Sequence, residues 1–374
     1  MVNRRWVLVA AALTLGVIAC GPAGGSAPED AVEVATRVAA TLAALRTDTP
    51  EDSPSPIPPP IATPVAPRLW KSYSSGGATG WWLEAGSATE VTMPVEPGQY
   101  YDFSAANGKI LYATHFANSG AGPGNLAVSD LWMIDYPSGT PVPLISSDTV
   151  VEALWTPDGA GAVYILATPT TYELRYRSLA GDDRLLASNV APTWSVSPSG
   201  NLAAFTRETG YAVPGAPGLF VVSLAGGPEA QVSDVDRQGT GSIDDRPEWS
   251  FDDAQLALSN WGSAPGELVV AASDGSLSGP LVVEETLSIN PMVGAGPTSV
   301  IWHPDGRHLV GFANYAESMG GPSPLVLYEL DESLHTITGG AVLAQGFSLV
   351  GWNVPGESLY LVDENNQIAL VSLP

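Results

Sequence analysis

The feature that most constrains this chain is a short phrase that recurs along it. The phrase is an aromatic residue, then a tight turn rich in Pro, Asp and Gly, then an apolar run, as in VIWHPDGRHLVGF at 300–312. Counterparts lie 39 to 55 residues apart and are anchored on Phe103, Trp155, Trp194, Trp249, Trp302 and Trp352. Self-similarity at such a period is typical of repeat architectures. The chain is therefore expected to fold as a series of similar units.

Each unit holds the pattern of a small sheet. Pro presets φ at the second position of a turn and Gly accepts a positive φ, so the Pro-Asp-Gly step predicts a tight turn between two strands. A third apolar run follows, for example LFVVSL at 219–224, and then a weaker, more polar one. Strands that grow more polar outward describe a propeller blade, whose inner strands are buried and whose edge faces water.

These repeats resemble the WD-like repeats of TolB-type β-propellers and the propeller portion of the prolyl oligopeptidase family. The resemblance covers 68–374 and implies an all-β fold, a β-propeller of about seven four-stranded blades. Six blades are the alternative, because the last unit (350–374) shows only three strand-like runs and 68–97 adds three more, so the two ends could share a blade. The propeller fold by itself does not specify a function.

The first twenty residues predict where in the cell the protein is located. Arg4 and Arg5 precede an apolar run at 6–19, which is too short to span a bilayer comfortably but suits the core of a signal peptide. The run ends in VIA directly before Cys20, the one Cys of the chain, and this resembles the bacterial lipoprotein signal. We predict a signal peptide at 1–19, lipid attachment at Cys20, and an extracytoplasmic location on the cell membrane. The alternatives are an ordinary secretory signal or an uncleaved anchor.

Residues 20–67 are predicted to be a tether. Residues 28–45 have helical composition, which favours a short spacer helix over a coiled-coil or partner-binding helix. The Pro-rich stretch at 47–67 predicts an extended stalk, with a docking motif as the alternative. The propeller domain then occupies 68–374.

The charge of the chain restricts its partners. It contains 14 Lys and Arg against 39 Asp and Glu, a net charge of −25. Such an acidic surface repels phosphate, so we expect no nucleic-acid partner, and it also repels anionic lipid headgroups. Contact with the membrane is therefore expected through the lipid on Cys20.

No familiar catalytic motif is present in the sequence: it lacks a Gly-x-Ser-x-Gly elbow, a Walker phosphate loop and a His-Glu-x-x-His helix. His303 and His308 flank a Pro-Asp-Gly turn, where polar residues are ordinary, and we interpret them as structural. We therefore predict no catalytic residues. A binding or scaffold module for an unknown protein, peptide or glycan is the leading hypothesis. A propeller-type extracellular hydrolase or lyase acting on a polymer is the alternative.

One acidic stretch, SDVDRQGTGSIDD at 233–245, has spacing that resembles a calcium loop. Calcium takes six to eight oxygen ligands, and Gly239 would let the loop fold back on the ion. The candidate ligands are Asp234, Asp236, Gln238, Thr240, Ser242 and Asp245. The match is imperfect, because Gln238 replaces an Asp and Asp245 is shorter than the usual Glu. An acidic, solvated loop is the alternative, and no other cofactor is expected.

Overall fold

The computed structural model describes residues 68–74, 77–84, 87–91, 99–113, 117–118, 127–209, 215–236, 246–260, 267–276, 278–280, 282–283, 290–291, 300–314, 324–363 and 367–374. The chain divides into two compact units, Met1–Pro59 and Pro60–Pro374, and every described residue belongs to the second. The regular elements bounded in these residues are the strands β1 to β28. The described residues contain no helix that is long and apolar enough to cross a membrane. The predicted features of 1–67 lie outside the described residues.

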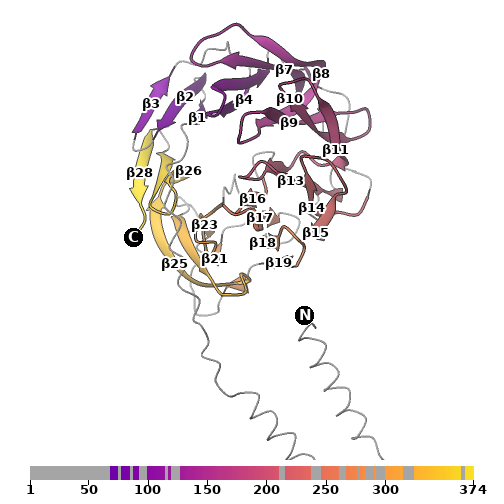
Figure 1. Ribbon diagram of the computed structural model, residues 1–374. Coiled ribbons are helices and arrows are strands. Elements are labelled where there is room, and N and C mark those ends of the chain that lie inside the picture. The colour runs from indigo at the N-terminus through magenta and orange to yellow at the C-terminus, as the bar shows by residue number, and fades with distance from the viewer. Residues whose placement is uncertain are drawn as a thin grey trace, which may run out of the picture. The chain divides into compact units, whose positions relative to one another are not determined.

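Most strands pair antiparallel with their neighbours in the chain, which groups them into successive sheets (Figure 1). The first sheet contains β1 (Arg68–Ser74), β2 (Gly77–Glu84) and β3 (Ser87–Val91). Next come β4 (Gln99–Ser104), β5 (Lys109–Ala113), β6 (Ala117–Asn118), β7 (Ala127–Asp135), β8 (Val142–Trp155), β9 (Gly161–Ala167), β10 (Tyr172–Ser178) and β11 (Asp183–Val190).

Two four-stranded sheets follow. The first contains β12 (Trp194–Val196), β13 (Leu202–Arg207), β14 (Gly218–Ser223) and β15 (Ala230–Ser233). The second contains β16 (Glu248–Trp249), β17 (Gln255–Asn260), β18 (Glu267–Ala272) and β19 (Ser278–Pro280).

The remaining strands form two more sheets. One contains β20 (Val282–Val283), β21 (Asn290–Pro291), β22 (Ile301–Trp302), β23 (His308–Asn314), β24 (Pro324–Leu330) and β25 (Thr336–Gln345). The other contains β26 (Phe347–Val354), β27 (Ser358–Asp363) and β28 (Ile368–Ser372).

Strand β8 belongs to two blades. It pairs with β7 at Val142–Ile145 and again at Val150, and it pairs with β9 from Val150 to Trp155. It is therefore the outer strand of one blade and the inner strand of the next. With this division the described strands form seven successive blades around a common axis (Figure 1), which we number 1 to 7 in chain order. The predicted all-β propeller is confirmed.

The first and last blades meet without sharing a strand. Each has three strands in the described residues, and no strand of one pairs with a strand of the other. They are joined through side chains: the Tyr360 hydroxyl donates to the Ser87 carbonyl oxygen at 2.9 Å, and Leu83 packs against Tyr360. In the described residues the ring is closed by side-chain packing, and the shared blade of the six-blade alternative is not formed.

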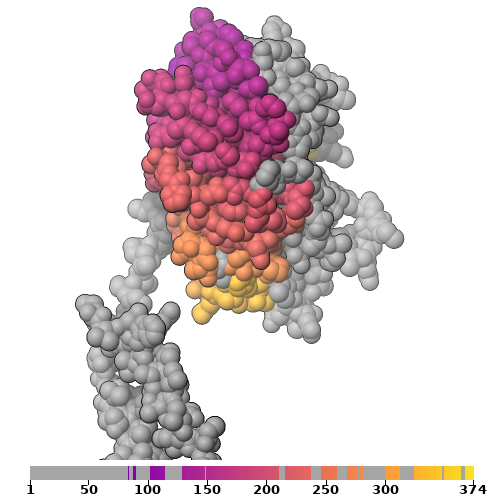
Figure 2. Space-filling view, turned by 90° about the vertical axis from the view of Figure 1, so that its right-hand side faces the viewer, coloured from indigo at the N-terminus to yellow at the C-terminus, as the bar shows by residue number. Residues whose placement is uncertain are grey.

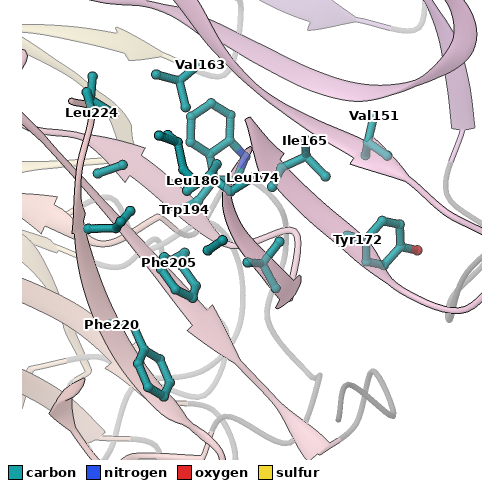
Figure 3. Close-up of a cluster of buried hydrophobic side chains, with 14 of the residues drawn as sticks. Val151, Val163, Ile165, Tyr172, Leu174, Leu186, Trp194, Phe205, Phe220 and Leu224 are labelled. Atoms are coloured by element: carbon teal, nitrogen blue, oxygen red, sulfur yellow. The ribbon is translucent and has the colours of Figure 1, made fainter. Parts of the chain in front are cut away.

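The core lies between the blades. The largest apolar cluster packs blade 3 against blade 4, with Trp194 among Val163, Leu174, Phe205 and Phe220 (Figure 3). Viewed from the side, the blades follow one another down the surface as successive bands of colour in chain order (Figure 2). Among the described residues, apolar clusters lie between consecutive blades from blade 2 to blade 7 and between blade 7 and blade 1. Period-2 strands with apolar residues on both faces require burial of this kind.

Two of the anchor Trp residues join neighbouring blades by polar as well as apolar contacts. The Trp302 indole N–H donates to the Glu248 carbonyl oxygen in blade 5 (3.1 Å). The Trp352 indole N–H donates to the Trp302 carbonyl oxygen in blade 6 (3.0 Å). A buried Trp usually finds a partner for its N–H, and in these two units the inner strand of the preceding blade supplies it. The anchors Trp155 and Trp249 lack this bond, since their buried indole N–H groups have no hydrogen-bond partner among the described residues.

Candidate functional site

Four polar or charged side chains converge from the inner strands of four consecutive blades. They are Asp102 on β4, Glu152 on β8, Trp194 on β12 and Arg246 directly before β16. Inner strands of neighbouring blades contact one another around the axis of the ring. We call these four residues the central cluster.

Glu152 is the centre of this cluster. Its Oε1 accepts a hydrogen bond from Arg246 Nη2 and forms an ion pair with it, and its Oε2 accepts from the Trp194 indole N–H at 3.1 Å. The Arg246 guanidinium lies 6.0 Å from the centroid of the Trp194 ring. The pairing of β8 with β9 shifts register between Val150 and Glu152. Irregularities of this kind redirect side chains at the rims of sheets.

Asp102 is bonded on both of its oxygens. The backbone N–H of Phe103 donates to Oδ1 at 2.8 Å, and that of Trp155 donates to Oδ2 at 2.7 Å. Burial raises the pKa of Asp102 to about 6, although both N–H groups and the Arg246 charge act to lower it. The nearby Glu152 charge adds to the increase. Burial disfavours the charged form of a carboxyl, which is why it dominates here.

Arg246 balances the two carboxylates. Burial opposes its charge, but the Glu152 and Asp102 carboxylates outweigh that effect, so the pKa of Arg246 is raised. Its side chain nevertheless keeps 24 % of its surface exposed, whereas that of Glu152 keeps 10 %. The cluster therefore holds one guanidinium between two carboxylates and leaves part of the guanidinium accessible.

The predicted calcium ligands are described only in part. Asp234 is exposed, and Asp236 is half-buried and accepts hydrogen bonds from the Thr209 backbone N–H (3.1 Å) and hydroxyl (2.7 Å). These bonds tie the segment after β15 to the end of β13. The other four candidates, Gln238, Thr240, Ser242 and Asp245, lie outside the described residues, as does Cys20. The calcium site stays a prediction.

The structure also groups residues that the sequence interpretation kept apart. His303 and His308, which the turn chemistry predicts to be structural, lie close to Asp305.

The central cluster was missed altogether by the sequence reasoning. A signal was present, because Glu152 and Arg246 each stand three residues before an anchor, Trp155 and Trp249. Aligning the repeats on their anchors places opposite charges at equivalent positions of two inner strands.

Comparisons with known proteins concern the fold. No protein-family model matches the chain, and no curated protein matches it. Among solved structures, TolB from Acinetobacter baumannii is similar, with 12% sequence identity and a TM-score of 0.43 over 82% of this chain and 78% of that chain.

A TolB described as putative, from Agrobacterium tumefaciens, is 13% identical with a TM-score of 0.41, over 77% of this chain and 94% of that chain. The β-propeller domain of the Trilobed protease from Pyrococcus furiosus is 10% identical with a TM-score of 0.45, over 83% and 95% of the two chains. The propeller assignment rests on the strand pairings of the chain itself.

Proposed function

We propose that this chain is a lipid-anchored extracytoplasmic protein whose β-propeller is a binding or scaffold module for a protein, peptide or glycan. The fold is consistent with such a module, because loops from every blade are presented around one axis. Anchoring is supported by the basic start, the apolar run and Cys20. A covalent lipid supplies the membrane affinity that a chain of net charge −25 lacks towards anionic headgroups.

The bonding of the central cluster carries the binding proposal. All four carboxylate oxygens of Asp102 and Glu152 accept hydrogen bonds from other groups of the chain. A carboxylate that acts as a general base or nucleophile needs an oxygen directed at the substrate. The accessible part of Arg246 instead suits a carboxylate or carbonyl group on a partner, which a guanidinium binds in a fixed geometry. The cluster therefore favours recognition over hydrolysis.

Crosslinking on intact cells tests the binding proposal. We expect a reproducible protein or glycan partner joined to residues on one face of the propeller. The variant Arg246→Lys keeps a positive charge beside Glu152 but loses the planar fork, and it should capture that partner less efficiently. Crosslinks to nothing but the chain itself, together with turnover of a peptide or glycan by the purified full chain, would contradict the proposal.

Metabolic labelling with an alkyne fatty acid tests the anchor separately. The wild-type chain should carry the label and fractionate with membranes, whereas Cys20→Ser should do neither. Because the chain has one Cys, the comparison has no competing thiol. An unlabelled wild-type chain would favour the ordinary secretory signal instead.

A second candidate function is a hydrolase or lyase acting on a polymer. The observation that favours it is Asp102, because a pKa of about 6 lies near the range in which carboxyl groups serve as general acids. A substrate screen that finds activity in the wild type and loses it in Asp102→Asn would support this candidate over the first.

A further inference from the structure

The turn between β22 and β23 brings two imidazoles and a carboxylate together. Nδ1 of His303 lies 3.0 Å from Asp305 Oδ1, and Nδ1 of His308 lies 2.7 Å from Asp305 Oδ2. If one possible ligand atom is taken from each of the three residues, these atoms all lie within 4.8 Å of one another. The exposed fraction of the side chain is 20% for His303, 30% for His308 and 39% for Asp305. An ion can therefore reach them from solvent.

The same turn recurs in other blades and shows what the fold itself requires. The first position of the turn is His303 in blade 6 and a residue with a hydroxyl in blades 3 and 5. There the hydroxyls of Thr156 and Ser250 donate to Asp158 and Asp252, both at 2.6 Å. The closing backbone bond is shared: the Gly306 N–H donates to the His303 carbonyl oxygen at 3.0 Å, as Gly159 does to Thr156 at 2.8 Å.

The sixth position of the turn differs in the same way. It is Gly161 in blade 3 and Gln255 in blade 5, but His308 in blade 6. A hydroxyl at the first position and no imidazole at the sixth are enough to form this turn. The two imidazoles of blade 6 thus exceed what the turn needs.

Neighbouring residues hold the first imidazole in place. The His303 ring packs edge-on against Trp352, with 5.7 Å between ring centroids. On another side Gly356 leaves it room, because a Cβ there would come within 3.1 Å of His303 Nε2. The ring is thus positioned by blade 7 as well as by its own turn.

We propose that His303, Asp305 and His308 bind a divalent transition-metal ion such as Zn²⁺. Two imidazole nitrogens and a carboxylate oxygen are ligands of this class of ion, whereas calcium takes oxygen ligands alone. Tetrahedral Zn²⁺ at its usual bond lengths separates ligand atoms by roughly 3.3 Å. One atom from each of the three residues lies within 4.8 Å of the others, so these partly exposed side chains must close by at most about 1.5 Å on binding. One coordination position is left for water or for a group of a partner.

Zn²⁺ titration of the untagged full chain by calorimetry tests the site. The matched variant is His303→Ser with His308→Gln, which installs the residues that blade 5 uses in its own turn. We expect the wild type to bind one Zn²⁺ per chain and the variant to bind it at least about tenfold more weakly. The variant keeps every carboxylate, so adventitious binding to the acidic surface is the same in both. His335→Gln, which changes a His outside the group, should bind as the wild type does.

Cobalt substitution gives a second measurement. Co²⁺ bound by the wild type should show visible absorption bands that are absent from the double variant and displaced by Zn²⁺. Unfolding midpoints of the metal-free proteins, equal in wild type and variant, would show that the turn still folds. Equal Zn²⁺ affinity in wild type and double variant would overturn the proposal, as would the absence of saturable binding in the wild type.

Discussion

At the scale of single residues, the central cluster shows how a propeller accommodates charge among its inner strands. Asp102, Glu152 and Arg246 come from three different blades, and a charge removed from water is tolerated only when it is paired and hydrogen-bonded. Every carboxylate oxygen has a donor, but Asp102 is bonded by two neutral N–H groups and faces a second carboxylate. Its proton therefore binds more tightly in the folded chain than in the unfolded one.

This difference predicts a pH dependence of stability. With a pKa of about 6 in the fold and 3.8 ordinarily, Asp102 binds more protons when folded between about pH 4 and pH 6. The free energy of unfolding should therefore fall by about 2 kcal/mol as the pH rises through that range. In Asp102→Asn this contribution should vanish, whereas any cost of the amide facing an N–H group is the same at every pH.

Urea unfolding at pH 4, 5, 6 and 7 measures the two slopes. Parallel pH profiles for the wild type and Asp102→Asn would show that the Asp102 proton is not responsible.

At the scale of elements, the anchor Trp is what attaches one blade to the next. Trp302 is 1% exposed, lies in the apolar layer between blades 5 and 6, and bonds the Glu248 carbonyl oxygen. The turn that follows it needs positive φ at Gly306 (68°), which Gly adopts without steric cost. The repeated phrase thus encodes a contact to the preceding blade and a reversal of the chain.

Truncating this anchor should be costly. We expect Trp302→Ala to lower the free energy of unfolding by about 3–5 kcal/mol, the usual cost of removing a buried Trp side chain. Trp302→Phe retains a ring but loses the N–H bond, and should cost less. Phe251→Ala is the matched control, because Phe251 is 44% exposed in the equivalent region of blade 5 and should cost under about 0.5 kcal/mol. Chemical denaturation of the three variants measures this order, and a Trp302→Ala variant as stable as the control would contradict the anchoring role.

At the scale of the whole ring, the junction between blades 7 and 1 has no backbone ladder in the described residues. Leu83 and Tyr360 pack there, and the Tyr360 hydroxyl bonds Ser87. Blades 7 and 1 are not consecutive in the chain, so no short chain connection joins them as it joins the other neighbouring blades. This junction is therefore expected to be the place where the ring opens most easily.

Removing one hydroxyl tests the junction. Tyr360→Phe should lower the free energy of unfolding by about 1 kcal/mol, because the Ser87 carbonyl loses its donor. Amide hydrogen exchange should quicken in β1–β3 and β26–β28 and stay unchanged in β12–β15. Uniform acceleration across all blades would mean that the junction does not open on its own.

Much of the fold could be predicted because its signals are local. The Pro-Asp-Gly turns, the apolar runs and the buried anchors Phe103, Trp155, Trp194, Trp302 and Trp352 all follow from residues within one repeat. The predicted calcium loop rests on local spacing as well. In the structure its residue Asp236 is bonded to Thr209, a partner that spacing alone does not reveal.

The sequence by itself determined the kind of unit, its period and its turns, because turn chemistry and strand alternation act over a few residues. Only the tertiary structure decided which side chains meet. Arg246 reaches Glu152 across 94 residues, and Tyr360 meets Ser87 across 273. These meetings depend on how far each blade is rotated from the last, which is the summed result of packing between all the blades. The sequence of a single repeat does not predict that summed rotation.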